Sequence, residues 1–144
     1  MASLAKRHIM VSKALQTLGN GIERYKQSLA NREQDSDYFR DALIQRFEYS
    51  IDTLWKFLKI YLQEQLQIPI EFNSPKAIIE ECLHANVINK TQHLVLLRCL
   101  NNRNETSHAY NESVAKEIIL EIPDLYLTMN TILQQISPIG HTKH

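Results

Sequence analysis

The sequence predicts an all-α protein, an up-down antiparallel helical bundle of four main helices plus one short helix. The chain has 144 residues with only 3 Gly and 4 Pro, whereas a strand-rich fold needs many turns. Its apolar residues recur at gaps of three and four, the spacing of one helix face. No useful stretch alternates as a half-buried strand does. We therefore expect one helical domain over residues 1–136 and a flexible tail over 137–144.

Two long apolar stripes predict the first two helices. The first stripe consists of Val11, Leu15, Leu18, Ile22, Tyr25 and Leu29. The second helix is expected over about 39–66, because the residue before Pro69 avoids helical backbone angles. Ser36 or Asp37 is expected to cap its start.

The third and fourth helices are predicted mainly from their capping residues. Ser74 and Pro75 supply a capping hydroxyl and a proline at the first helical position, so the short helix begins there. Thr91 is expected to cap the fourth helix. The residues expected to face inward from that helix are Leu94, Leu97 and Leu100.

The fifth helix is expected to begin at Asn111 or Ser113 and to continue to about residue 136. Pro123 lies inside its apolar pattern and is expected to kink it, because proline removes a backbone hydrogen bond.

Composition narrows the classes of function. Sixteen basic and sixteen acidic residues cancel, so any RNA binding must come from a local basic patch. Cys82 and Cys99 occupy apolar positions and are expected to be buried, reduced thiols. No spacing of Cys and His resembles a zinc site, and neither a metal nor a cofactor is expected. With no membrane-length apolar stretch and no signal-peptide pattern, we expect a cytoplasmic protein without a membrane association.

The segment from Arg103 to Tyr110 carries the residue types of a chemical site. Arg103 and His108 are five residues apart, which on an ideal helix is a rotation of roughly 140°. For both to reach one ligand, the helix must end or distort near Ser107, or the two residues must come from different subunits.

These residue types suit phosphodiester cleavage. A histidine accepts a proton from a ribose 2′-hydroxyl or donates one to the leaving oxygen, and an arginine neutralises charge that builds on phosphate. Asn104 either orients the imidazole or binds a phosphate oxygen. The plain structural alternative is that Arg103 caps a helix end and His108 is a surface turn residue.

The same residues resemble a known signature. Arg103 to His108, with Asn104 after the arginine, resembles the Arg-x4-6-His motif of HEPN domains (higher eukaryotes and prokaryotes nucleotide-binding). Tyr110 extends it to Arg-x4-His-x-Tyr, the form typical of the HEPN toxin of a toxin–antitoxin pair. Residues 46–56 are similar to that subgroup's Arg-Phe-Glu-…-Trp-Lys segment. The resemblance spans nearly the whole chain.

This resemblance implies a metal-independent endoribonuclease toxin that cleaves RNA. Arg103 and His108 would be catalytic and Asn104 a supporting group. The partner would be a cognate minimal nucleotidyltransferase, the antitoxin, which adds AMP to the motif tyrosine, here Tyr110. The alternative is a non-catalytic nucleotide- or substrate-binding subunit of a nucleotidyltransferase complex, a role long described for the same family.

A homodimer is expected from the chemistry as well as from the resemblance. Acid–base cleavage works best with two proton-transfer groups beside one phosphate, and the motif offers one histidine. A two-fold axis beside the motif would supply the second copy. We therefore expect both copies of Arg103 and His108 to line one cleft.

Three further residues have two interpretations each. Glu48, on the same helix face as Asp52, either pairs with an arginine or orients His108 as a supporting group, or it is a solvated charge. Trp55 is expected to pack in the core or in the dimer interface. Tyr110 is either the modified residue or a half-buried packing residue at a helix start.

Overall fold

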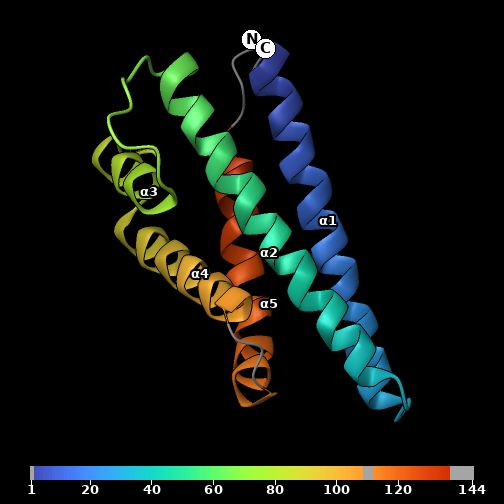
Figure 1. Cartoon of the computed structure of the whole chain (residues 1–144). Helices are drawn as coiled ribbons and strands as arrows, with labels where there is room; N and C mark the ends of the chain where they lie inside the picture. The colour runs from blue at the N-terminus through green and yellow to red at the C-terminus, as the bar shows by residue number, and fades with distance from the viewer. Residues whose placement is uncertain (1, 109–111, 137–144) are drawn as a thin grey trace.

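The computed structural model describes residues 2–108 and 112–136, and within these ranges the regular structure is entirely helical. The elements are α1 (Ala2–Ala30), α2 (Ser36–Ile60), the π-helical turn η1 (Tyr61–Gln65), α3 (Pro75–His84), α4 (Lys90–His108) and α5 (Glu112–Gln135). The predicted bundle of four main helices and one short helix is thus confirmed (Figure 1).

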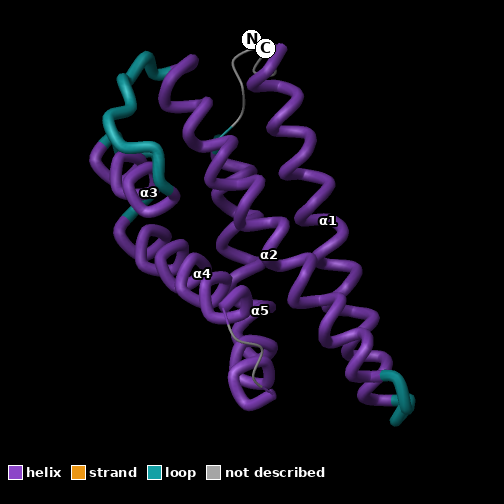
Figure 2. The backbone as a smooth tube through the Cα atoms, in the orientation of Figure 1, coloured by secondary structure: helices purple, strands orange, loops and turns teal. Residues whose placement is uncertain are grey.

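The helices form a bundle with one long hairpin at its edge. α1 and α2 run antiparallel side by side, and α5 packs against both (Figure 1). α4 packs against α5 and α2, and the short helix α3 packs against both α2 and α4. Figure 2 shows that the longest described loop connects η1 to α3. Because α3 packs against both α2 and α4, segments of these three helices that are distant in sequence are neighbours in space.

The core is built from the apolar stripes that the sequence shows. Phe47, Phe57 and Leu54 of α2 are fully buried, as are Leu15 and Leu18 of α1. Burial of such side chains is the main favourable term in folding.

The first stripe is wrong at its last member, since Leu29 is 52% exposed. In Figure 1 that end of α1 lies beside α2 alone, beyond the reach of α5, so the stripe has no second helix to pack against. The stripe pattern reports which face could be buried and not how far the neighbouring helices extend.

Two predicted helix starts have different outcomes. Ser74 caps α3 as predicted, because its Oγ accepts a hydrogen bond from the backbone N–H of Ala77 at 3.3 Å. The prediction of Ser36 or Asp37 as the cap of α2 is wrong, because α2 already begins at Ser36. Asp35 takes the cap position, without a side-chain capping hydrogen bond.

The predicted cap of α4 at Thr91 is also wrong, because α4 begins at Lys90. Asn89 Oδ1 accepts from the backbone N–H of Gln92 at 2.8 Å, and Gln92 Oε1 accepts from the backbone N–H of Asn89 at 2.9 Å. This reciprocal capping box satisfies two backbone donors at once.

The inward face of α4 is predicted correctly at two of its three leucines, which are half-buried and pack against the core, and wrongly at the first. Leu94 is 55% exposed, whereas Leu96 and Cys99 are fully buried. The buried face also includes Gln92 and Asn102, each only 8% exposed. Because two polar residues occupy the most buried face of α4, the spacing of its apolar residues alone predicted that an adjacent face of the helix would be buried.

α5 begins at Glu112, so Ser113 is not its start, and Asn111 lies outside the described residues. The helix continues through Pro123, and a kink there stays a prediction. No helix within residues 2–108 and 112–136 combines the length and the apolar character that a membrane span needs. The predicted tail over 137–144 is likewise outside the described residues.

Both cysteines are buried free thiols, as predicted. Burial raises the pKa of Cys82 and of Cys99 to about 12. We therefore expect iodoacetamide at pH 8 to label neither thiol in the folded protein and both in urea, since the thiolate is the reactive form. Thiols in the unfolded chain ionise near pH 8.5, whereas the buried thiols stay protonated. Their contribution to the free energy of unfolding is therefore fully present below pH 8.5 and is lost as the pH rises toward 12. Rapid labelling of the folded protein would contradict their burial.

Candidate functional site

A pocket of about 670 Å³ lies between α2, the start of α3 and α4. Its lining residues are Asp52, Trp55 and Lys56 from α2, Ser74, Pro75 and Lys76 from the start of α3, and Leu97, Leu100, Asn101, Arg103 and Asn104 from α4. The pocket thus contains two residues of the Arg-x4-His motif and the end of the second matching segment.

Arg103 forms a two-point ion pair with Asp52 at this pocket. Its Nε donates to Asp52 Oδ1 at 3.1 Å, and its second guanidinium nitrogen, Nη2, donates to Asp52 Oδ2 at 3.1 Å. Each side chain is 31% exposed. The hydrogen bond to Asp52 raises the pKa of Arg103, so the guanidinium stays charged and is held in one orientation.

Sequence reasoning assigned no role to Asp52, although one signal was present. Asp52 follows Glu48 by four residues, so the two acids share a face of α2. After Asp52, the negative charge of Glu48 also raises the pKa of Arg103. Glu48 is half-buried, and this charge effect fits the predicted interaction with an arginine; its predicted action on His108 stays a prediction.

The pocket combines positive charge with an apolar wall. Lys56 and Lys76 line it beside Arg103, and Asn104 is exposed at the same pocket. Trp55 is half-buried and packs against the core while it lines the pocket. Such a surface suits an anionic ligand with a flat apolar part, because cations bind phosphate and aromatic rings stack on bases.

α4 continues as one helix through Arg103 and ends at His108. No break therefore separates the two motif positions, which remain roughly 140° apart around the helix axis. The helix end lies one residue after Ser107, near the predicted end, and the two routes to a common ligand, a helix end and a second subunit, both stay predictions. The side chain of His108, and Tyr110 as a whole, lie outside the described residues.

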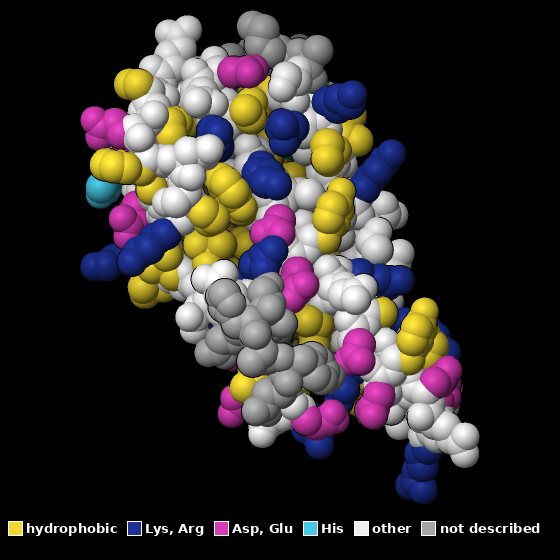
Figure 3. Space-filling view, in the orientation of Figure 1, with side chains coloured by type: hydrophobic (Ala, Val, Ile, Leu, Met, Phe, Trp, Pro, Cys, Tyr) yellow, Lys and Arg dark blue, Asp and Glu magenta, His cyan; other side chains and the backbone are white. Residues whose placement is uncertain are grey.

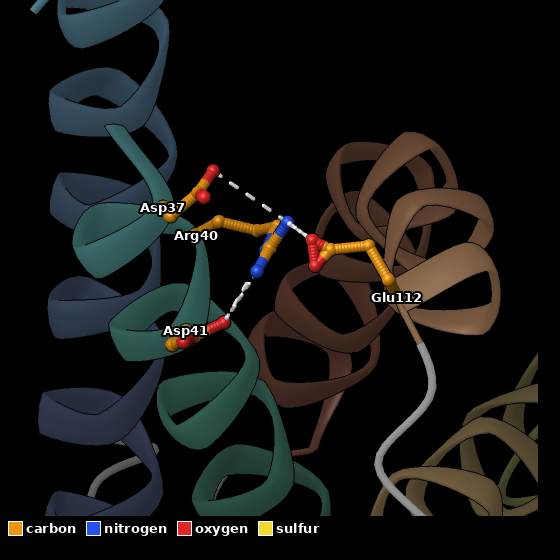
Figure 4. Close-up of polar contacts among 4 residues, drawn as sticks. All are labelled: Asp37, Arg40, Asp41 and Glu112. Carbon is orange, nitrogen blue, oxygen red and sulfur yellow. Dashed lines mark hydrogen bonds and ion pairs between the residues drawn. The ribbon is translucent and has the colours of Figure 1, made fainter. Parts of the chain in front are cut away.

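A second charged cluster fixes the start of α5, immediately after the motif segment. Arg40 of α2 is only 5% exposed and contacts three carboxylates (Figure 4). Its guanidinium lies 3.2 Å from Glu112, 3.2 Å from Asp41 and 3.6 Å from Asp37. Because Glu112 is the first residue of α5, this cluster holds the start of α5 against α2.

Metal ligands are not gathered in the described part of the chain. Across residues 2–108 and 112–136, no three His, Cys, Asp or Glu side chains are grouped so as to hold a metal ion. The expectation that the site needs neither metal nor cofactor stays a prediction.

A comparison with protein families matches residues 6–137 to the family described as nucleotidyltransferase substrate binding protein like. A protein of known structure from Thermus thermophilus is 34% identical, with a TM-score of 0.70 over 87% of this chain and 97% of that one. A comparison with curated protein sequences found no significant match.

Two further solved structures share the fold at lower identity. A Shewanella oneidensis HEPN toxin, tri-AMPylated and in complex with an MNT antitoxin, is 18% identical with a TM-score of 0.64 over 87% of this chain and 94% of that one. A mutant of the toxin–antitoxin pair MntA–HpeT is 14% identical with a TM-score of 0.64, over 87% of this chain and 95% of the matched one.

Proposed function

Because the chain belongs to the nucleotidyltransferase substrate-binding protein-like family, we propose that it is the endoribonuclease toxin of a toxin–antitoxin pair. Its cognate partner is a minimal nucleotidyltransferase that neutralises it by adding AMP. The toxin acts on RNA in the cytoplasm as a homodimer and needs no metal ion.

The observation that carries this proposal is the two-point ion pair between Arg103 and Asp52 at the edge of the pocket. An arginine held in this way is a preorganised anion site, which costs no reorganisation when charge develops on a bound phosphate. Lys56 and Lys76 add positive charge to the same pocket, and Asn104 supplies an amide for a phosphate oxygen.

The reaction is an internal transesterification. One His108 accepts the proton of the ribose 2′-hydroxyl, and the 2′-oxygen forms a bond to phosphorus while the bond from phosphorus to the 5′-oxygen breaks. The second His108 donates a proton to that 5′-oxygen. The products are a 2′,3′-cyclic phosphate and a 5′-hydroxyl, and Arg103 neutralises the charge on the phosphate oxygens in between.

Two subunits supply these groups. The motif offers one histidine, and Arg103 and His108 occupy different sides of α4 in one chain. A two-fold axis beside the end of α4 places both copies of each residue at one cleft.

A second candidate function is favoured by the family's own description. A non-catalytic subunit that binds nucleotide or substrate for a nucleotidyltransferase would use the same pocket. Such a subunit has no need of a proton-transfer histidine. The two functions therefore differ in whether His108 matters for an effect on RNA.

The direct test is incubation of the purified protein with labelled RNA in the presence of EDTA. We expect fragments that end in a 2′,3′-cyclic phosphate and growth arrest when the protein is expressed without its partner. RNA that stays intact, together with harmless expression, would favour the binding subunit.

Tyr110 is the proposed site of control. Transfer of AMP from ATP to the tyrosine oxygen releases pyrophosphate and places a negative phosphate and a base beside the cationic pocket, where they compete with RNA. After incubation with the partner enzyme and ATP, we expect the wild-type protein to gain at least one AMP unit by mass spectrometry and Tyr110→Phe to gain none. The control is Tyr38→Phe, because Tyr38 is 68% exposed on α2. An equal gain in Tyr110→Phe would contradict the assignment.

A further inference from the structure

We propose that single-stranded RNA follows a basic groove between α1 and α2 that leads into the Arg103 pocket. This inference rests on the proposed function and names the surface that holds the RNA next to the cleaved bond.

The groove adjoins the pocket at one shared lining residue, Lys56. A hollow of about 170 Å³ shares Lys56 with the 670 Å³ pocket. A larger hollow of about 500 Å³ shares Met10 and Tyr49 with that smaller one. We call these two hollows together the α1–α2 groove. Its lining residues are Arg7, Met10, Lys13, Ala14, Thr17, Ala42, Gln45, Arg46, Tyr49, Thr53 and Lys56.

The groove is strongly basic although the chain has sixteen basic and sixteen acidic residues. The described residues that line the groove include four cations, Arg7, Lys13, Arg46 and Lys56, and no carboxylate. In the adjoining pocket the carboxylate is Asp52, which already pairs with Arg103. Figure 3 shows Lys and Arg side chains gathered over the upper parts of α1 and α2, with acidic atoms at the upper edge and further acidic side chains lower on the same face. This local field suits a polyanion.

An exposed aromatic side chain stands where the two hollows of the groove meet. Tyr49 lines both and is 55% exposed. Aromatic side chains of this kind stack with the bases of single strands, and flanking cations follow the backbone. Arg46 and Lys56 are ten residues apart on α2, about 15 Å along the helix axis, so cations stand on both sides of Tyr49 along the groove.

A second copy of this chain is a poorer occupant of the groove. An isologous contact would place the four cations of one groove against the same four of its mate, and like charges repel when they are desolvated. RNA supplies the opposite charge.

The test measures binding without cleavage, so that it does not depend on the catalytic proposal. The probe is a fluorescent 12-nucleotide RNA with 2′-O-methyl riboses, followed by anisotropy over a range of salt. The groove variant is Arg7→Gln/Lys13→Gln/Lys56→Gln, and the control is Lys26→Gln/Lys90→Gln/Lys116→Gln. The control removes the same charge from exposed positions outside the groove.

We expect the groove variant to bind more weakly and the slope of log affinity against log salt to fall by about 2, since each lost phosphate contact removes about 0.7. The control triple keeps the wild-type slope. Tyr49→Ala is expected to weaken binding on the order of tenfold and Tyr49→Phe to preserve it.

Three results would overturn the inference: no binding by the wild type, equal losses in the two triple variants, or a groove variant that loses only its association with a protein partner. If the groove variant loses RNA binding and the wild type never cleaves RNA, the groove stands and the nuclease proposal fails.

Discussion

Replacement of His108 by alanine is expected to lower RNA cleavage by a factor on the order of 10² to 10⁴, the usual contribution of a positioned acid or base. In the proposed mechanism both proton transfers come from copies of this residue, so the variant would lose the base and the acid together. Initial rates of fragment release from labelled RNA measure the effect. Expression of the variant without its partner is expected to be harmless to the cell.

His84→Ala is the matched control, because the His84 side chain on α3 is 75% exposed and lies outside the pocket. It is expected to keep wild-type activity. The wild-type rate is expected to fall at both ends of the pH range, since one histidine must be neutral and the other protonated. Toxicity that survives His108→Ala would contradict the mechanism.

Replacement of Arg103 by alanine is expected to lower cleavage on the order of 10²- to 10³-fold, the range seen when one preorganised charge-stabilising donor is removed. The loss has a second part in this protein. Asp52 would keep its negative charge at the pocket without its partner and would repel the RNA phosphate. Arg103→Lys is expected to be weak as well, because a lysine ammonium cannot reproduce the two-point contact with Asp52.

Arg98→Ala is the control for this change. Arg98 lies on the same helix and pairs with Glu121 of α5 at 2.6 Å, outside the pocket. Both variants are expected to lose at most about 1 kcal/mol of stability in urea unfolding, because both ion pairs are partly exposed. Equal activity in the Arg103→Ala and Arg98→Ala variants would contradict the proposed catalytic role of Arg103.

Most of the fold was predictable because the apolar stripes on α1, α2 and α5 are long and regular. α4 was harder, since its buried face includes the polar residues Gln92 and Asn102. The cap of α4 was missed for a related reason. Asn89 and Gln92 cap it reciprocally. Thr91 was predicted instead because it has a hydroxyl of the kind that caps helices.

The candidate site was predictable only along one helix. The spacing of Arg103 and His108 is visible in the sequence, but Asp52 is 51 residues away from Arg103 and meets it through the packing of α4 on α2. The α1–α2 groove has the same origin, because Arg7 and Lys56 come together only when the hairpin forms. Such pairings depend on helix register, which a single sequence does not reveal.

The central claim is that two subunits share one cleavage site, and a mixing experiment tests it most directly. Wild-type and His108→Ala chains are coexpressed at one to three and purified as randomly paired dimers. A shared cleft that needs both histidines predicts that activity per wild-type subunit falls to about a quarter, the fraction of wild-type subunits paired with each other. Activity per wild-type subunit that does not change with mixing would contradict the shared cleft.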